Sequence, residues 1–174
     1  IGQTLYSDNF GVMLLAERET AGVLRVHPSY RAPAEVKERL KTIPLGHGVT
    51  GQVAADGLAR RVPDVTCAPD YLVTEARMRS ELCVPLKSGD RILGVINAES
   101  ARVDDFGEAD ERLLVTIAGQ LATAIQNVRQ FAATAEALAR EQRLNEVART
   151  LSGVLDLPSV LQNIVRLAAE VVGA

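Results

Sequence analysis

The sequence has few aromatic residues and no excess of basic charge, and both shortages exclude nucleic-acid binding. It contains three Phe, three Tyr and no Trp among 174 residues, so it lacks the aromatic platform on which unpaired bases stack. Its formal net charge of −3 leaves no basic surface to neutralise a phosphate backbone. We therefore expect no nucleic-acid partner.

Cysteines and long apolar runs are also scarce. Cys67 and Cys83 are the two cysteines, which are too few for a disulfide framework or a zinc site. No apolar run approaches the length that crosses a bilayer, and the chain opens without the charged start and apolar core of a signal peptide. These absences predict a cytoplasmic segment with no membrane partner.

Apolar residues, in contrast, are plentiful and predict one core with a sheet. They make up 47% of the chain, which suits one domain with a helical extension. Apolar runs at 10–16 and 23–27 flank a polar link that contains glycine, and runs at 81–86 and 91–99 flank a polar turn at Gly89. Each pair of runs is typical of a β-hairpin.

Helices are predicted between and after these hairpins. Residues 34–40 have helical spacing on a mostly polar surface, and a short helix from about 50 to 56 is stopped by Gly57. A much longer helix begins at Asp110 and continues to near Ser152. Its apolar residues alternate steps of three and four, as in a coiled-coil seam: Leu114, Ile117, Leu121, Ala124, Val128, Phe131, Ala135 and Leu138.

The long helix is predicted to change partners along its length. Residues 110–125 can pack on the sheet of their own domain, but beyond about Gln130 the stripe outruns a compact domain and needs another chain. We therefore expect a homodimer through helix 110–152. Near Gln142 the apolar series slips by a residue, as at a stammer, and resumes at Leu144, Val147, Leu151 and Val154.

Four segments, taken in order, resemble a GAF domain, the regulatory module of sensor kinases, cyclases, phosphodiesterases and transcription activators. They are IPLGHGVTGQVAADG from Ile43, VPDVTCAPDY from Val62, RSELCVPLKSGDRILGVINAES from Arg79, and DDFGEADERLLVTIAGQLATAIQNVRQ from Asp104. The resemblance implies an α+β fold: a central antiparallel sheet of five to six strands, helices packed on it, and a long C-terminal helical extension.

The resemblance also implies a ligand pocket between the sheet and residues 64–80. We expect five residues to close over it: Tyr71, Leu72, Met78, Arg79 and Ser80. Arg79 is the candidate for binding an anionic or carbonyl-bearing ligand, because a guanidinium offers several donors in fixed geometry. The alternative for Arg79 is a salt bridge with Glu75 or Glu81. The cofactor is unknown from sequence, and no metal site is expected.

The last segment, LNEVARTLSGVLDLPSVLQNIVRLAAEVVGA from Leu144, resembles the opening of a second GAF domain. The predicted domains are a GAF-like sensor at 1–130 whose first helix is largely missing, a coiled-coil linker at 131–155, and the first helix of a following domain at 156–174. We expect that last helix to pack in the vacated place, on its own chain or on a neighbour. The second domain, or an output domain of the same protein, is then a further partner.

Two motifs have competing interpretations. Residues 46–51 satisfy G-x-G-x-x-G, but KERLKTIPL before them is not the apolar strand that a dinucleotide site requires. The glycines are better explained by a sharp turn and a close approach to the sheet. Asn97 with Phe106 to Glu111 matches most of the signature of GAF domains that bind cyclic nucleotides, although Ala98 replaces its Lys. Phe106 as a buried anchor and Asp110 near a helix start are the local alternative.

Catalysis is not predicted, so we expect the chain not to be an enzyme. The GAF-like reductases of free methionine sulfoxide carry Cys where this chain has Thr50, and another Cys before the Ser-Glu pair, where none lies between Ala68 and Glu81. His27 and His47 are the only histidines and neither has the context of a nucleophile's base. Cys67 is a redox candidate, whereas Cys83 in an apolar run is a core residue.

The expected function is therefore a regulatory GAF module that binds a small molecule and relays the signal through a dimeric helix. A ligand would favour one of two helix packings that the slip near Gln142 allows. A dimerisation and relay module without ligand is the first alternative. A redox sensor based on Cys67 is the second, and it requires an exposed thiol with a depressed pKa.

Overall fold

The structure, a computed structural model, describes residues 8–16, 22–154 and 157–172. It divides into two units, residues 1–126 and 127–174, with helix α4 (Glu108–Val154) passing from the first into the second. The second unit also contains helix α5 (Leu157–Val172). Among the described residues, none of the helices is both long enough and apolar enough for a membrane span. The predicted boundaries at 130 and 155 stay predictions.

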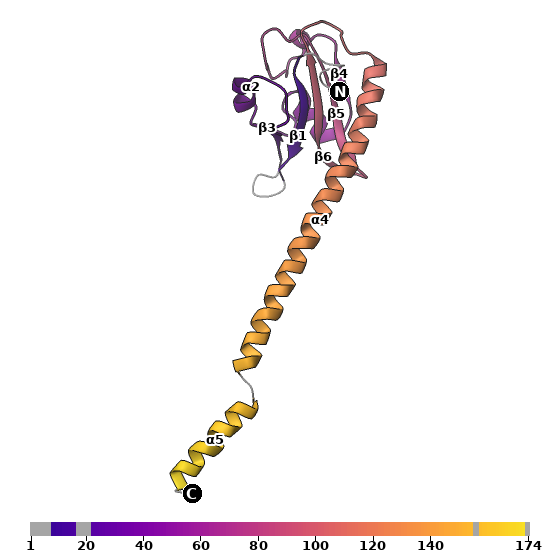
Figure 1. Ribbon diagram of the computed structural model, residues 1–174. Helices are drawn as coiled ribbons and strands as arrows, with labels where there is room; N and C mark the ends of the chain where they lie inside the picture. The colour runs from indigo at the N-terminus through magenta and orange to yellow at the C-terminus, as the bar shows by residue number, and fades with distance from the viewer. Residues whose placement is uncertain (1–7, 17–21, 155–156, 173–174) are drawn as a thin grey trace. The chain divides into compact units, whose positions relative to one another are not determined.

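The first unit is built on a six-stranded antiparallel sheet, which confirms the predicted α+β class (Figure 1). The strand order is β3-β2-β1-β6-β5-β4. The bounds are β1 Phe10–Leu15, β2 Val23–Val26, β3 Thr42–Pro44, β4 Arg60–Val62, β5 Ser80–Ser88 and β6 Arg91–Ser100. β5 and β6 form the longest pair, and Gly89 turns between them with a φ of 58°.

Both predicted hairpins are present. β1 pairs with β2 in antiparallel register, Met13 opposite Val26, while most of the predicted link between them lies outside the described residues. β5 pairs with β6 from Ser80 opposite Ser100 to Ser88 opposite Arg91. The two hairpins join because β1 also pairs with β6, so strands from the two ends of the domain meet at the centre of the sheet.

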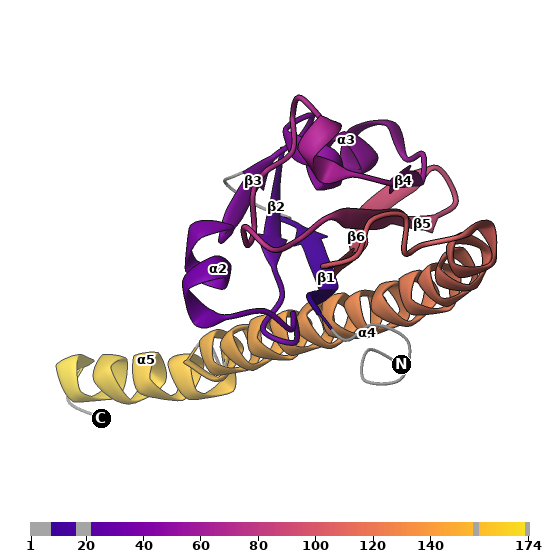
Figure 2. The ribbon, with the colours of Figure 1, turned by 90° about the horizontal axis from the view of Figure 1, so that it is seen from above.

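Helices cover the two faces of the sheet (Figure 2). The beginning of α4 covers one face, where Leu114, Ala118 and Ala122 pack on the apolar residues of β5 and β6. Helix α3 (Gly48–Asp56) covers the other, together with α2 (Ala34–Arg39) and the segment 63–79, which contains the single-turn helix η1 (Val65–Cys67). α3 begins two residues before its predicted start.

Glycine sets the position of α3. A Cβ on Gly51 would lie 2.5 Å from the Pro44 carbonyl oxygen, so only glycine allows this approach of helix to strand. Gly57 ends the helix in the left-handed conformation and donates its N–H to Val53. The strand before the glycines is the short edge strand β3, antiparallel to β2, so no dinucleotide-binding βαβ unit exists here.

The local interpretation of the F-x-x-x-D-E segment is confirmed. Phe106 is buried in the core on the α4 side. Asp110 accepts a hydrogen bond from the backbone N–H of Gly107 at 2.8 Å, and acidic residues fill the first turn of α4, where the helix dipole favours them. Asn97, the other part of the signature, lies in the cavity beneath α3, so Phe106 and Asn97 serve opposite faces of the sheet.

Candidate functional site

The face of the sheet under α3 carries a buried set of polar side chains. Strand register sets two rows across β4, β5 and β6: Arg60 opposite Cys83 opposite Asn97, and Val62 opposite Glu81 opposite Glu99. Residues directly opposite each other project to the same face. Glu81, Asn97 and Glu99 are 3%, 1% and 1% exposed. We call Arg60, Glu81, Asn97 and Glu99 the polar patch.

Glu99 is the satisfied member of the polar patch. Its Oε2 accepts a hydrogen bond from Asn9 Nδ2 at 2.9 Å. Its Oε1 accepts from the Tyr71 hydroxyl at 3.0 Å and from the Thr74 hydroxyl at 2.8 Å. Glu99 therefore ties the segment 63–79 and the start of β1 to the centre of the sheet.

Glu81 and Asn97 have unused acceptors. Glu81 Oε2 and Asn97 Oδ1 are both buried without a hydrogen-bond partner, while the Asn97 amide donates to the Tyr30 hydroxyl at 3.3 Å. Both residues line a cavity of about 10 Å³ with Thr50, Leu72 and Thr74 among its other walls. That volume holds about one water molecule. The cavity thus presents two acceptors that no described protein group satisfies.

Burial makes this pair of carboxyl groups resist ionisation. Desolvation raises the pKa of Glu81 well above its usual range, and the charge of Glu99 raises it further, while the Asn97 amide acts in the opposite direction. Desolvation also raises the pKa of Glu99, although hydrogen bonds from Asn9, Thr74 and Tyr71 lower it. A positive charge placed in the cavity would favour ionisation of both.

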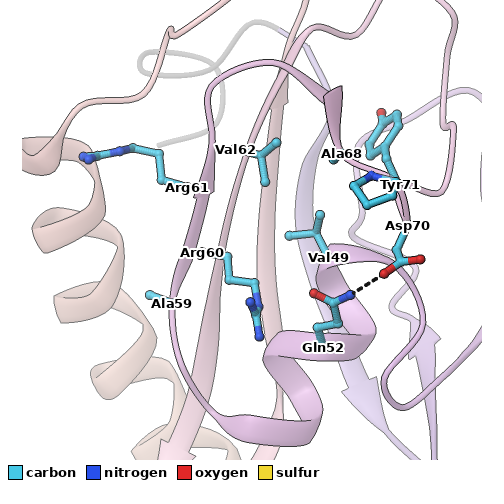
Figure 3. A pocket seen from close by; sticks show the side chains of 10 residues that line it. Val49, Gln52, Ala59, Arg60, Arg61, Val62, Ala68, Asp70 and Tyr71 are labelled. Atoms are coloured by element: carbon cyan, nitrogen blue, oxygen red, sulfur yellow. Dashed lines mark hydrogen bonds between the residues drawn. The ribbon is translucent and has the colours of Figure 1, made fainter. Parts of the chain in front are cut away.

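A larger pocket of about 430 Å³ is lined by residues of α3, β4 and the segment 63–79 (Figure 3). Val49 lines both this pocket and the small cavity. Gln52 of α3 donates a hydrogen bond to Asp70 at 3.2 Å across the mouth, so α3 and the segment 63–79 are joined here. Figure 3 shows Arg60 turned toward α3 and Arg61 turned to the other side of β4. The other walls are Ala59, Val62, Ala68, Pro69 and Tyr71.

The structure places three of the five predicted ligand-binding residues against the sheet. The Tyr71 hydroxyl donates a hydrogen bond to Glu99, and the Tyr71 side chain lines the larger pocket. Leu72 lines the small cavity and lies over Gly48, where an added Cβ would be 2.7 Å from the leucine side chain. Met78 is 2% exposed. Whether a ligand touches them stays a prediction.

Arg79 and Ser80 are engaged with the protein itself. Arg79 forms an ion pair with Asp64, Nη2 to Oδ2 at 2.8 Å, rather than with Glu75 or Glu81. This partner holds the pKa of the Asp64 carboxyl well below its usual range. The Ser80 hydroxyl donates to the Arg102 carbonyl oxygen at 2.7 Å.

The two cysteines occupy different environments. Cys67, the redox candidate, is exposed at the end of η1. Cys83 is buried between Arg60 and Asn97 in the register of the sheet. Desolvation, and next the charge of Glu81, raise the pKa of the Cys83 thiol. In the described part of the chain no group of three or more His, Cys, Asp or Glu side chains could hold a metal ion.

Sequence reasoning did not predict Arg60, Glu81 or Glu99 as site residues, and it considered Asn97 only as part of a cyclic-nucleotide signature. A usable signal is present, because strand alternation places Glu81, Asn97 and Glu99 at inward positions, flanked by the inward apolar residues of SELCVPL and GVINAES. Charged side chains are almost never fully buried unless they are paired, so inward carboxylates indicate a site. Arg60 carries no comparable signal, since its strand has three residues.

Comparison with known proteins assigns this fold, with its pocket beneath the short helix α3, to a family. A family model described as GAF domain matches residues 2–126, and the chain belongs to the GAF domain family. Protein YtsP of Bacillus subtilis is 32% identical over 108 residues, 62% of this chain and 63% of that protein.

Reductases are among the relatives. Free methionine-R-sulfoxide reductase of Escherichia coli is 30% identical over 89 residues, so the chain matches about half (54%) of that protein's length and 51% of its own. The solved structure of free methionine-R-sulfoxide reductase from Neisseria meningitidis in complex with its substrate is 32% identical, with a TM-score of 0.62, covering 70% of this chain and 69% of that one.

These relatives correct one prediction. The expectation that the chain is not an enzyme is wrong, because enzymes with this fold share about a third of its residues over most of the domain. The absence of Cys at Thr50 and between Ala68 and Glu81 does not decide the question, since proteins of one fold can carry different catalytic residues.

Proposed function

We propose that this chain is a regulatory GAF module that binds a small molecule bearing an ammonium group beneath the segment 63–79. The observation that carries the proposal is the pair of buried, unpartnered acceptors, Glu81 Oε2 and Asn97 Oδ1, in one cavity. Buried polar atoms without partners are rare in native proteins. An ammonium group supplies three donors and the positive charge that two neighbouring carboxyl groups favour.

The charge of the site also selects against other ligands. A phosphate in the cavity would find no positive charge among its described walls and would raise the pKa of these two carboxyl groups further, so the cavity does not favour a cyclic nucleotide. An amine is attracted, and the relatives support this choice because free methionine sulfoxide is an amino acid and so carries an ammonium group. Binding here requires the segment 63–79 to move, since the cavity now holds about one water.

The experiment is calorimetric titration with the twenty standard amino acids, free methionine sulfoxide and simple alkylamines. We expect at least one amine to bind, to release protons as Glu81 ionises, and to raise the melting temperature. Glu81→Gln should weaken it about tenfold or more. The control is Glu108→Gln, a change at an exposed side chain that pairs with Arg112. Equal affinity in wild type and Glu81→Gln would refute the proposal.

A second candidate is reduction of free methionine sulfoxide, favoured by the reductases among the relatives; the thiol proposed to act is that of Cys83, which lies opposite Asn97 in the strand register and is reached only if the core around it opens. Attack of this thiol on the sulfoxide sulfur would transfer the oxygen to Cys83 as a sulfenic acid and release methionine; an added dithiol would then reduce the sulfenic acid to thiol and water. The assay follows methionine production with dithiothreitol as reductant. Turnover lost in Cys83→Ser and kept in Cys67→Ser supports this candidate, and no turnover in wild type rejects it.

We further propose that occupancy is relayed through a homodimer of α4. Apolar side chains are exposed along its second half: Val128, Phe131, Leu138, Leu144 and Val147. Their spacing suits a coiled coil, which a second copy would bury. Sedimentation should show a dimer that Phe131→Asp weakens, while Thr134→Asp, a change at a residue whose hydroxyl bonds its own helix, weakens it less. A monomeric wild type would reject the relay.

A further inference from the structure

Arg60 has a guanidinium group in which one donor nitrogen is paired and another, buried, is not. It lies on the edge strand β4, directly opposite Cys83, and its Nη2 forms an ion pair with Asp56 at the end of α3. Its Nε is buried and has no partner. Nε–H and the adjacent Nη2–H form the edge of a guanidinium that binds both oxygens of a carboxylate. Asp56 uses one half of that edge.

Unpartnered buried atoms of opposite character converge on one face. Four buried side-chain nitrogen or oxygen atoms of the described residues have no hydrogen-bond partner, and three belong to the polar patch: Arg60 Nε, Glu81 Oε2 and Asn97 Oδ1. The first is a donor on a cation, and the other two are acceptors, one of them on a carboxyl group. A ligand that satisfies all three must offer an acceptor at one end and donors at the other.

The spacing suits a small ligand rather than a direct ion pair. Because Arg60 pairs with Cys83, Glu81 is its diagonal neighbour on the same face, a relation that separates Cβ atoms by about 7–8 Å. Arg60 nevertheless pairs with Asp56, not with Glu81. Val49 lines both the pocket of about 430 Å³ beside Arg60 and the cavity beside Glu81, and the volume of the pocket lies in the range of ligand sites.

We propose that Arg60 binds the anionic group of a zwitterionic ligand whose ammonium group lies against Glu81 and Asn97. The inference rests on the proposed function and narrows its ligand class to compounds with a carboxylate, or a similar anion, a few bonds from the amine. The ligand anion takes the Nε and Nη2 edge, and Asp56 gives up or shares its contact. Arg60 is then a specificity-determining residue that distinguishes amino acids from plain amines.

The test compares each amino acid that binds with its carboxamide, which keeps the ammonium group and lacks the negative charge. Wild type should prefer the acid by about 10- to 100-fold, the range of a hydrogen bond to a charged group. Arg60→Gln should lose that preference by weakening the acid and leaving the amide unchanged. Arg112→Gln is the matched control, because Arg112 is an exposed residue of α4 that pairs with Glu108 and lines neither the pocket nor the small cavity, and it should keep the preference.

The outcomes separate this inference from the proposed function. If wild type binds the acid and the amide with equal affinity, and Glu81→Gln weakens both, the proposed role of Arg60 is overturned. The proposed ammonium site at Glu81 then still stands. A preference that persists in Arg60→Gln overturns that role as well. Absence of binding by every amine overturns both. The comparison of acid and amide on wild type needs no variant, so misfolding of Arg60→Gln cannot hide the result.

Discussion

The two faces of the sheet differ although the same strands build them. On the α4 face, the inward residues of β5 and β6 are apolar and pack on Leu114, Ala118 and Ala122. On the α3 face, the alternate residues of the same strands include Glu81, Asn97 and Glu99, all buried. One residue along a strand changes the face, so adjacent positions in β5 and β6 serve different purposes.

The two faces differ in what the burial of their side chains contributes to the free energy of folding. Apolar side chains on the α4 face gain from burial. Carboxyl groups on the α3 face lose hydration, and Glu81 recovers little of that loss because its Oε2 lacks a partner. Both faces carry a buried apolar cluster, but only the α3 face adds buried carboxyl groups to it. Three substitutions can break or sharpen this contrast.

The largest effect is expected on the α4 face. Leu114→Ala should lower the free energy of unfolding by about 3 kcal/mol, because a fully buried leucine is replaced by a cavity. Denaturant titration measures the change. Leu113→Ala on the same helix, at a side chain that is 42% exposed, should cost less than about 1 kcal/mol. Similar losses at the two positions would contradict the assignment of this face.

An intermediate effect is expected at Glu99. Glu99→Ala should lower the free energy of unfolding by about 2 kcal/mol, because Asn9, Tyr71 and Thr74 lose their shared acceptor. This loss should outweigh the relief of charge repulsion at Glu81. Hydrogen exchange should also become faster in the segment 63–79. Glu38→Ala on the surface of α2 is the control, and equal stability of the two variants would count against the network.

The smallest effect is expected at Glu81, with the opposite sign. Its pKa is raised in the folded state, so its contribution to stability is present below the unfolded pKa of about 4.3 and is lost as pH rises through the folded pKa. Glu81→Gln should match wild type in acid and exceed its stability at pH 7.5 by on the order of 1 kcal/mol.

Denaturant titration from pH 4 to pH 8 measures this difference. The pH dependence should become shallower rather than vanish in Glu81→Gln, because the pKa of Glu99 is raised as well. Parallel profiles for wild type and variant would show that Glu81 keeps an ordinary pKa. Together with Glu99→Ala, this variant compares a buried carboxyl group that has hydrogen-bond partners with one whose Oε2 has none.

Local patterns predicted most of the elements. Both hairpins, α3 with its stop at Gly57, and the long helix from near 110 follow from periodicity and turn residues. The three-residue strands β3 and β4 escaped prediction, because a strand so short has no readable alternation and exists only through its neighbour.

The predicted ligand-binding residues stay predictions, and the polar patch was not among them. The segment over the pocket was located by resemblance, and Tyr71 and Leu72 do lie against the cavities. Arg79 was predicted to bind the ligand, but its guanidinium forms an ion pair with Asp64. Arg60 was overlooked because its importance depends on pairing with Cys83, a relation between residues far apart in the sequence.

The sequence by itself determined the family, the order of the main elements and the alternation that buries Glu81 and Glu99, because these depend on residues within a few positions of one another. Only the tertiary structure decided that β4 joins the far edge of β5 and that Arg60, Glu81 and Asn97 share one face. Strand neighbours and register result from packing across the whole sheet, and unsatisfied donors and acceptors become visible only when every possible partner has been placed.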